Sequence, residues 1–92
     1  MRRAVQLANR RGLHARASNR LVTMASRFAS QLTLAVGDLE VDAKSMMGVM
    51  LFGATLYEQG NPPFTIGADG PDAADALDAL AVLIGERFGE MD

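Results

Sequence analysis

The chain has 92 residues, 49% of them hydrophobic, which is enough for one compact core, so we expect a single domain over residues 1–92. It contains no cysteine and a single histidine, which excludes disulfides, thiolate chemistry and a histidine-rich metal cluster, and we expect no metal. The longest apolar run spans residues 46–56, well short of the ~20 residues of a membrane-spanning helix, so we expect a soluble cytoplasmic protein without membrane insertion.

The net charge of −2 hides an uneven distribution of charge along the chain. Residues 1–37 carry seven basic and no acidic groups, whereas residues 38–92 carry two basic and eleven acidic groups. This asymmetry favours an acidic partner, a phosphate ligand or nucleic acid at the basic end, unless the arginines simply scatter over solvated faces. We expect no nucleic acid, because Phe28 is the one aromatic residue in the basic third and the acidic remainder repels phosphates.

The apolar pattern along the chain predicts seven elements. Alternating polar and apolar residues predict four strands, at residues 2–8, 30–36, 39–43 and 64–68. Apolar residues at helical spacing predict three helices, over residues 15–28, over residues 45–54 and from residue 71 to the C-terminus. The last helix is expected to carry one apolar stripe formed by Ala73, Leu77, Leu80, Ile84 and Phe88. The order β-α-β-β-α-β-α fits an α+β fold, a four-stranded antiparallel sheet with helices on one face.

His14, the one histidine of the chain, follows Gly12 and directly precedes the first predicted helix. A helix start leaves free backbone amides, here those of Ala15, Arg16 and Ala17, which together with the helix dipole form an anion site. Arg16 adds a planar guanidinium that suits a tetrahedral dianion. These are the parts of a phosphorylatable histidine, because phosphoryl transfer depends mainly on positioning and electrostatics. The competing interpretation is a polar loop residue without a role.

Three segments resemble HPr, the histidine-containing phosphocarrier of the bacterial phosphotransferase system. They are GLHARAS at residues 12–18, KSMMGVM at residues 44–50 and ADGPDAADALDAL at the start of the last helix. They occur in the order of the family, and the resemblance covers essentially the whole chain. It implies an open-faced β-sandwich, four antiparallel strands with three helices on one side.

The resemblance also implies a phosphoryl relay without a cofactor. Enzyme I, charged from phosphoenolpyruvate, would phosphorylate His14, and the carrier would pass the group to a histidine of an EIIA-type protein. Arg16 would be the charge partner of His14, and Ala15 and Ala17 would offer backbone amides to the phosphate. The family suggests a monomer, and it leaves both sugar uptake and a regulatory nitrogen-type chain open as the pathway.

Ser45 matches a serine that an HPr kinase/phosphorylase phosphorylates in some lineages of the family. Such a phosphate would add about two negative charges beside an apolar docking surface and weaken binding to acidic partners. A helix N-cap explains a serine at this position equally well. The alternative function is therefore a regulatory docking module of HPr fold, controlled by Ser45 phosphorylation and without phosphoryl relay.

The expected partner-binding surface consists of Met46, Met47 and Met50. Met46 and Met50 are four residues apart and share a helix face, and methionine adapts to several partner shapes. Arg20 and Arg27 of the first helix would either lie at the rim of this surface or be solvated.

Two features depart from the family pattern. Ala17 stands where most members have proline, and alanine keeps a backbone N–H that proline lacks. The connection over residues 53–64 is a few residues longer than usual, which would either lengthen the second helix or add a loop.

Overall fold

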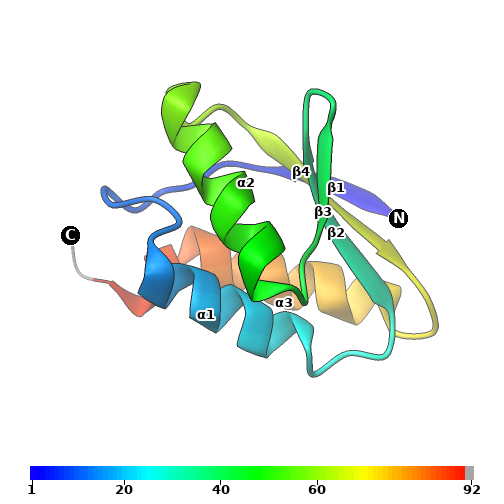
Figure 1. Ribbon diagram of the computed structural model, residues 1–92. Helices are drawn as coiled ribbons and strands as arrows, with labels where there is room; N and C mark the ends of the chain where they lie inside the picture. The colour runs from blue at the N-terminus through cyan, green and yellow to red at the C-terminus, as the bar shows by residue number, and fades with distance from the viewer. Residues whose placement is uncertain (91–92) are drawn as a thin grey trace.

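The computed structural model describes residues 1–90, so the last two residues of the expected domain lie outside the described range. Its elements are β1 (Arg2–Val5), α1 (Ala15–Ala25), β2 (Gln31–Val36), β3 (Leu39–Asp42), α2 (Met46–Glu58), β4 (Phe64–Asp69), α3 (Ala73–Gly85) and the short 3-10 helix η1 (Arg87–Gly89). The strands pair antiparallel in the order β1-β4-β2-β3, and the three helices cover one face of the sheet (Figure 1). The expected open-faced β-sandwich is confirmed.

The covered face of the sheet is apolar because side chains alternate along each strand. Leu32 and Leu34 of β2 are fully buried. Phe64, Ile66 and Ala68 of β4 are at most 5% exposed. Leu34 lies opposite Ile66 in the antiparallel register. The alternation read from the sequence therefore places the correct residues against the helices.

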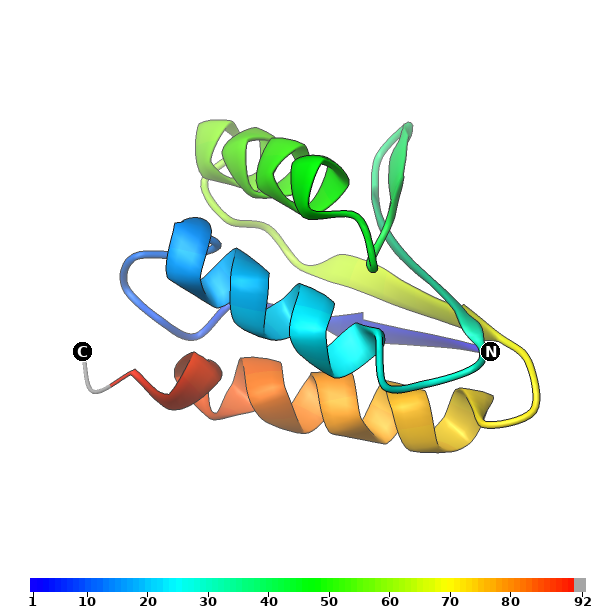
Figure 2. The same cartoon turned by 60° about the horizontal axis from the view of Figure 1, so that its bottom comes forward.

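Helix α1 lies between α2 and α3 and packs against both of them (Figure 2). Its buried Ala17 and Ala25 are small, which allows close approach, and Leu21 between them is fully buried. From α2, the buried ring of Phe52 meets the ring of Phe64 edge-on, with 5.2 Å between the centroids. The N-terminus of the central helix, where His14 lies, is thus fixed by packing on both sides.

Helix α1 ends at Ala25, three residues before the predicted end at residue 28. The hydroxyl and the backbone N–H of Ser26 both donate to the Val22 carbonyl, at 2.7 and 2.9 Å, and close the last turn. Phe28 still packs against the core from the following turn, partly buried. Because Phe28 packs against the core, its position in the sequence matches the apolar spacing that a longer helix would have.

Strand β1 ends at Val5 rather than at residue 8. Val5 pairs with Phe64, the first residue of β4, and the two prolines before Phe64 lack the N–H groups that further pairing needs. Leu7 nevertheless packs against the core as the alternation predicts.

Helix α2 continues to Glu58, four residues beyond the predicted end. Gly60 and Asn61 then take left-handed conformations, with φ of 79° and 54°, and turn the chain toward β4. Of the two alternatives for the long connection, the helix extension is therefore the observed one. Within residues 1–90, no helix combines the length and apolar character needed to cross a membrane.

The prediction of a single apolar stripe on a helix running to the C-terminus is wrong at Phe88. Helix α3 ends at Gly85, and Arg87 and Phe88 adopt φ of 57° and 55° in η1. Left-handed backbone costs about 1–2 kcal/mol per residue. Phe88 is almost fully buried, and burial of a phenylalanine side chain contributes about 1.5–3 kcal/mol, which offsets much of that cost.

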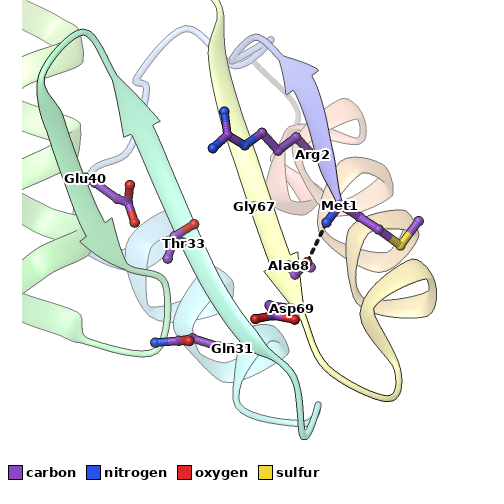
Figure 3. A pocket seen from close by; sticks show the side chains of 8 residues that line it. All are labelled: Met1, Arg2, Gln31, Thr33, Glu40, Gly67, Ala68 and Asp69. Atoms are coloured by element: carbon purple, nitrogen blue, oxygen red, sulfur yellow. Dashed lines mark hydrogen bonds between the residues drawn. The ribbon is translucent and has the colours of Figure 1, made fainter.

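The opposite face of the sheet is open and polar. In Figure 3, Arg2, Gln31, Thr33 and Glu40 line a shallow hollow of about 260 Å³ on this face, with the helices behind the sheet. Gly67 also lines it, and a Cβ atom there would lie 2.5 Å from the Thr33 hydroxyl oxygen. Residue 67 must therefore be glycine for β4 to approach β2 with Thr33 in this conformation.

Asp72 fastens the start of α3 to the turn that precedes β2. Its carboxylate accepts hydrogen bonds from the backbone N–H groups of Ala29 and Ser30, both at 2.9 Å, and from the Ser30 hydroxyl. The backbone N–H of Asp72 donates in return to that hydroxyl at 3.2 Å. These bonds, led by the one from the Ser30 side chain, hold the pKa of Asp72 below its ordinary value of 3.8.

Replacing Asp72 by asparagine should lower the thermal unfolding midpoint at neutral pH, because an amide cannot accept all three bonds. A lowered pKa contributes stability above the unfolded-state value, about 4, and loses it as the pH falls through the folded-state value. The difference between wild type and Asp72→Asn should therefore be constant above about pH 4 and shrink below it.

Asp75→Asn makes the same charge change in the first turn of α3 and serves as the control. It should change the midpoint less at every pH. A wild-type advantage that persists undiminished in strong acid, or an equal effect of Asp75→Asn, would contradict this account of Asp72.

Candidate functional site

His14 caps the N-terminus of α1. Gly12, with φ of 65°, turns the chain into the helix, and His14 follows in extended backbone with φ −72° and ψ 178°. The His14 carbonyl accepts the first helical bond, from the Ser18 N–H at 2.8 Å. The imidazole Nδ1 accepts a hydrogen bond from the Arg16 N–H at 3.2 Å, the side-chain bond of an N-cap. Nδ1 therefore carries a lone pair at the positive end of the helix dipole.

Of the predicted anion-binding groups, the backbone N–H of Arg16 contacts Nδ1. Ala15, Arg16 and Ala17 form the first turn of α1, whose amide groups precede the first intrahelical bond. The Arg16 side chain is exposed, and Ala17 is buried. The arrangement favours a negatively charged group at Nδ1.

Glu90, which nothing close in sequence indicates, contacts the other ring nitrogen. Its Oε2 lies 2.6 Å from His14 Nε2, and the two side chains are only 12% and 17% exposed. Because Nδ1 accepts from Arg16, the proton of a neutral ring is on Nε2, which donates to the carboxylate. The sequence analysis did not identify this residue, because 76 positions separate it from His14.

Asn9 connects Glu90 to the loop before His14. It is 5% exposed, and its Nδ2 donates both to the Gly12 carbonyl and to Glu90 Oε1, each at 2.7 Å. Because the Gly12 carbonyl and Glu90 Oε1 can only accept, the Asn9 amide must be oriented with its NH₂ group toward them. The carboxylate of Glu90 is thereby held through both of its oxygens.

The C-terminal segment reaches His14 because α1 holds η1. Arg20 of α1 donates from Nη1 to the Phe88 carbonyl, and the Phe88 ring is buried in the core. Figures 1 and 2 both show this last described segment beyond the end of α3 and next to the start of α1. Arg20, expected at the rim of the methionine surface or solvated, is exposed and contacts η1 through this bond.

Arg20 and Arg27 also line a hollow of about 240 Å³ together with Met24 of α1 and Leu83 of α3. The hollow that Arg20 and Arg27 share is therefore lined by residues of α1 and α3. The methionines of the expected docking surface are on a different helix, α2.

The exposed side of α2 is apolar and reaches His14. Met47 is 85% exposed, Met50 is also exposed and Met46 is partly buried. Leu51 and Tyr57, which the sequence analysis did not single out, are exposed as well. Val49 and Phe52 of the same helix are fully buried.

A hollow of about 370 Å³ joins this side of α2 to the histidine. It is lined by Arg11, Gly12, Leu13, His14, Met50, Gly53, Ala54, Tyr57, Glu58 and Asn61. A partner seated on α2 would therefore lie beside the imidazole.

Ser45 is the N-cap of α2, and its hydroxyl accepts the Gly48 N–H at 3.1 Å. The start of α2 lies beside the end of α1, where Lys44 Nζ donates to the Phe28 carbonyl at 2.7 Å. Ser45 as a whole is partly buried. Elsewhere in residues 1–90, no three acidic or histidine side chains gather into a group able to hold a metal ion.

Comparisons with known proteins agree over the full length of the chain. The family model for the PTS HPr component phosphorylation site matches residues 1–86. The chain belongs to the HPr family. The phosphocarrier protein HPr of Cupriavidus necator is 43% identical over 90 residues, which cover 98% of this chain and 97% of that protein. The phosphocarrier protein NPr of Shewanella violacea is 32% identical over 98% of this chain and 94% of its own length.

Solved structures of HPr proteins have the same fold as this chain. The crystal structure of HPr-C-His from Thermoanaerobacter tengcongensis matches with a TM-score of 0.87 at 33% identity, covering 100% of this chain and 99% of that one. Membership of the HPr family carries the role of a phosphocarrier in the phosphotransferase system.

Gly53 sets the distance between α2 and the loop that carries His14. A Cβ atom at Gly53 would lie 2.7 Å from Leu13 Cβ and 2.8 Å from the Leu13 carbonyl oxygen, closer than packed atoms approach. Gly53→Ala should therefore lower the free energy of unfolding by about 1–3 kcal/mol, although alanine is the better helix former. It should also shift the NMR resonances of His14.

Gly85→Ala is the matched control, since nothing lies within 4 Å of a Cβ atom there. It should be neutral or raise the free energy of unfolding by up to about 1 kcal/mol, without moving the His14 resonances. Urea unfolding and amide spectra of the two variants make the comparison. Equal stabilities would show that α2 does not need its close approach to Leu13.

Proposed function

We propose that the chain accepts a phosphoryl group on His14 Nδ1 from enzyme I charged by phosphoenolpyruvate, and donates it to EIIA-type proteins. The observation that supports this most directly is the bond from the Arg16 N–H to Nδ1, which leaves this nitrogen unprotonated at the N-terminus of α1. An unprotonated imidazole nitrogen is a nucleophile without prior loss of a proton.

The transfer needs no acid or base from the carrier. The Nδ1 lone pair forms a bond to phosphorus while the phosphorus–nitrogen bond of the phosphohistidine donor breaks, and the donor keeps that electron pair. The proton on Nε2 stays in place. The phosphoryl oxygens then take the position in which the first-turn amides and the exposed Arg16 guanidinium stabilise negative charge.

The docking surface of this proposal is the exposed side of α2, with Met46, Met47 and Met50. It continues into the hollow that Met50 lines together with His14, so a single partner covers both. Flexible methionine side chains suit a carrier that must fit a donor and then an acceptor of different shape. Exposed apolar residues clustered in this way are typical of an interaction site.

The carrier is proposed to act in the cytoplasm and without a cofactor. Its EIIA-type acceptor belongs to sugar uptake, to a regulatory nitrogen-type branch, or to both. The similarity to both an HPr and an NPr over nearly the whole chain is compatible with each pathway.

The test is incubation with enzyme I from the source organism and labelled phosphoenolpyruvate. We expect about one acid-labile phosphoryl group per chain. Since the chain has one histidine, His14→Ala should abolish the label while circular dichroism shows an unchanged fold. Arg16→Ala should slow labelling about tenfold, because it removes a charge-assisted contact of a kind that contributes roughly 1.5–3 kcal/mol.

Label that persists in folded His14→Ala would move the acceptor to another residue. Absence of label on wild type, with an enzyme I active on a second HPr, would favour the regulatory docking module instead. Chase of the labelled carrier with purified EIIA proteins of the sugar and nitrogen types then identifies the branch it serves.

We further propose that Ser45 is phosphorylated by an HPr kinase and that the phosphate weakens docking. Its hydroxyl lies at the start of α2, the helix that carries the docking methionines. A phosphate there keeps favourable contact with the helix dipole but places about two negative charges at the edge of a surface that binds acidic partners.

Two substitutions separate the structural role of Ser45 from the effect of charge. Ser45→Ala removes the cap and should lower the free energy of unfolding by about 1 kcal/mol, with phosphorylation by enzyme I unchanged. Ser45→Asp keeps a good cap and should preserve stability, yet slow phosphorylation by enzyme I. Thermal unfolding and initial labelling rates measure both. Equal labelling rates for the two variants would show that charge at this position does not control docking.

A further inference from the structure

We propose that Glu90 is a positioning residue that holds His14 in the Nε2-protonated tautomer and balances the positive charge that the ring gains on phosphorylation. This inference rests on the proposed transfer at His14 and assigns to the C-terminal segment a role in it. The carboxylate meets Nε2 at 2.6 Å, at the lower end of charge-assisted distances, with both groups largely shielded from water.

The tautomer follows from two bonds at opposite sides of the ring. Arg16 N–H donates to Nδ1 at 3.2 Å, at the long end of the hydrogen-bond range, and this bond favours the Nε2-protonated tautomer. Glu90 accepts at Nε2, and a carboxylate can only accept. With the proton of the neutral ring drawn to Nε2, the nucleophilic lone pair is on Nδ1, beside the first-turn amides of α1.

The carboxylate itself is fixed, which distinguishes this contact from a flexible surface ion pair. Its second oxygen, Oε1, accepts from the buried Asn9, whose other N–H is bonded to the Gly12 carbonyl. Oε1 and Oε2 are thus both engaged with the loop that carries His14. A carboxylate held in this way keeps the imidazole plane in one orientation.

The backbone that delivers Glu90 is built at a cost. Arg87 and Phe88 both have left-handed φ angles, and the carbonyl of Phe88 is held by Arg20 of the same helix that His14 caps. Burial of the Phe88 ring anchors the segment two residues before Glu90. The turn at Arg87 and Phe88 ends the helical path of α3, and Glu90 after it contacts the histidine.

The chemistry of transfer gives Glu90 its second role. When Nδ1 forms a bond to phosphorus, its lone pair is consumed and the protonated ring becomes cationic, with the proton still on Nε2. The Glu90 carboxylate lies on that N–H and stabilises the positive charge in the transition state and in the product. The phosphoryl group forms on the other nitrogen, so the carboxylate does not compete for its position.

The experiment compares wild type, Glu90→Gln and Glu86→Gln. Glu86 is an exposed glutamate four residues earlier, and its substitution makes the same charge change without touching His14. Long-range ¹H–¹⁵N spectra at the neutral limit of a pH titration report which ring nitrogen is protonated. Initial rates of phosphorylation by enzyme I and thermal unfolding midpoints are measured for all three proteins as well.

Wild type and Glu86→Gln should both show an unprotonated Nδ1 and a protonated Nε2, with equal phosphorylation rates. In Glu90→Gln the side-chain amide cannot serve as acceptor to both Asn9 and His14, so the two ring nitrogens should move toward averaged shifts. Its phosphorylation rate should fall about tenfold, the size expected for loss of one charge-assisted bond, with the unfolding midpoint nearly unchanged.

A wild-type ring without preference for the Nε2-protonated form would overturn the inference, as would a Glu90→Gln spectrum identical to wild type. If Glu90→Gln lowers the unfolding midpoint but keeps the wild-type tautomer, the role of Glu90 is structural, and this result would overturn the inference too. The spectra of the unphosphorylated protein need no partner. Failure of the phosphoryl relay itself appears only in the labelling of wild type, so the two failures are distinguishable.

Discussion

The packing of α1 between α2 and α3 is the constraint on which the site depends. His14 caps this central helix, and its surroundings come from three separate parts of the chain: the loop that begins at Asn9, the middle of α2 and the C-terminal segment. Gly53 allows α2 to approach the loop at Leu13, and Arg20 of α1 holds the Phe88 carbonyl. A rotation or shift of α1 would therefore disturb the cap, the hollow and the contact to the C-terminal segment together.

Most of the fold could be predicted from local patterns, because each element buries one face and leaves the other in water. The sheet keeps strict alternation on β2 and β4, where Leu32, Leu34 and Ile66 face the helices. The starts of α1 and α2 could be read from the sequence, since His14 directly precedes the first apolar repeat and Ser45 is of a type that caps helices. His14 and Ser45 accordingly lie where the pattern places them.

The ends of the helices were harder to predict, because tertiary packing and not periodicity decides them. Phe28 and Phe88 both occupy the core at positions that a longer helix would also have supplied. Each is delivered by a turn instead, and the one at Phe88 uses left-handed backbone at two residues that are not glycine. No propensity rule predicts such a turn, since burial of the ring compensates a conformation that the residue itself disfavours.

The same turn explains why the acidic neighbour of His14 could not be predicted. The apolar spacing predicts a helix that continues from α3 to the C-terminus, and such a helix gives no indication that Glu90 contacts the histidine. Because α3 stops at Gly85 and the chain turns through η1, Glu90 comes within hydrogen-bond distance of His14, which is 76 residues away in sequence. Gly89 next to Glu90 is the one local sign of a turn, and its φ of 79° is left-handed.

A carrier must hold its phosphoryl group strongly enough to receive it and weakly enough to release it. The site meets both needs by separating the charges across the imidazole. On the Nδ1 side, the groups available to a dianion are backbone amides and the exposed Arg16 guanidinium, which water screens. On the Nε2 side, the shielded Glu90 carboxylate favours the cationic ring and does not touch the phosphoryl oxygens. Because the Glu90 contact stabilises the cationic ring in the transition state and in the phosphorylated carrier alike, it favours reception of the group, whereas the water-screened groups on the Nδ1 side leave the phosphoryl oxygens open to an acceptor.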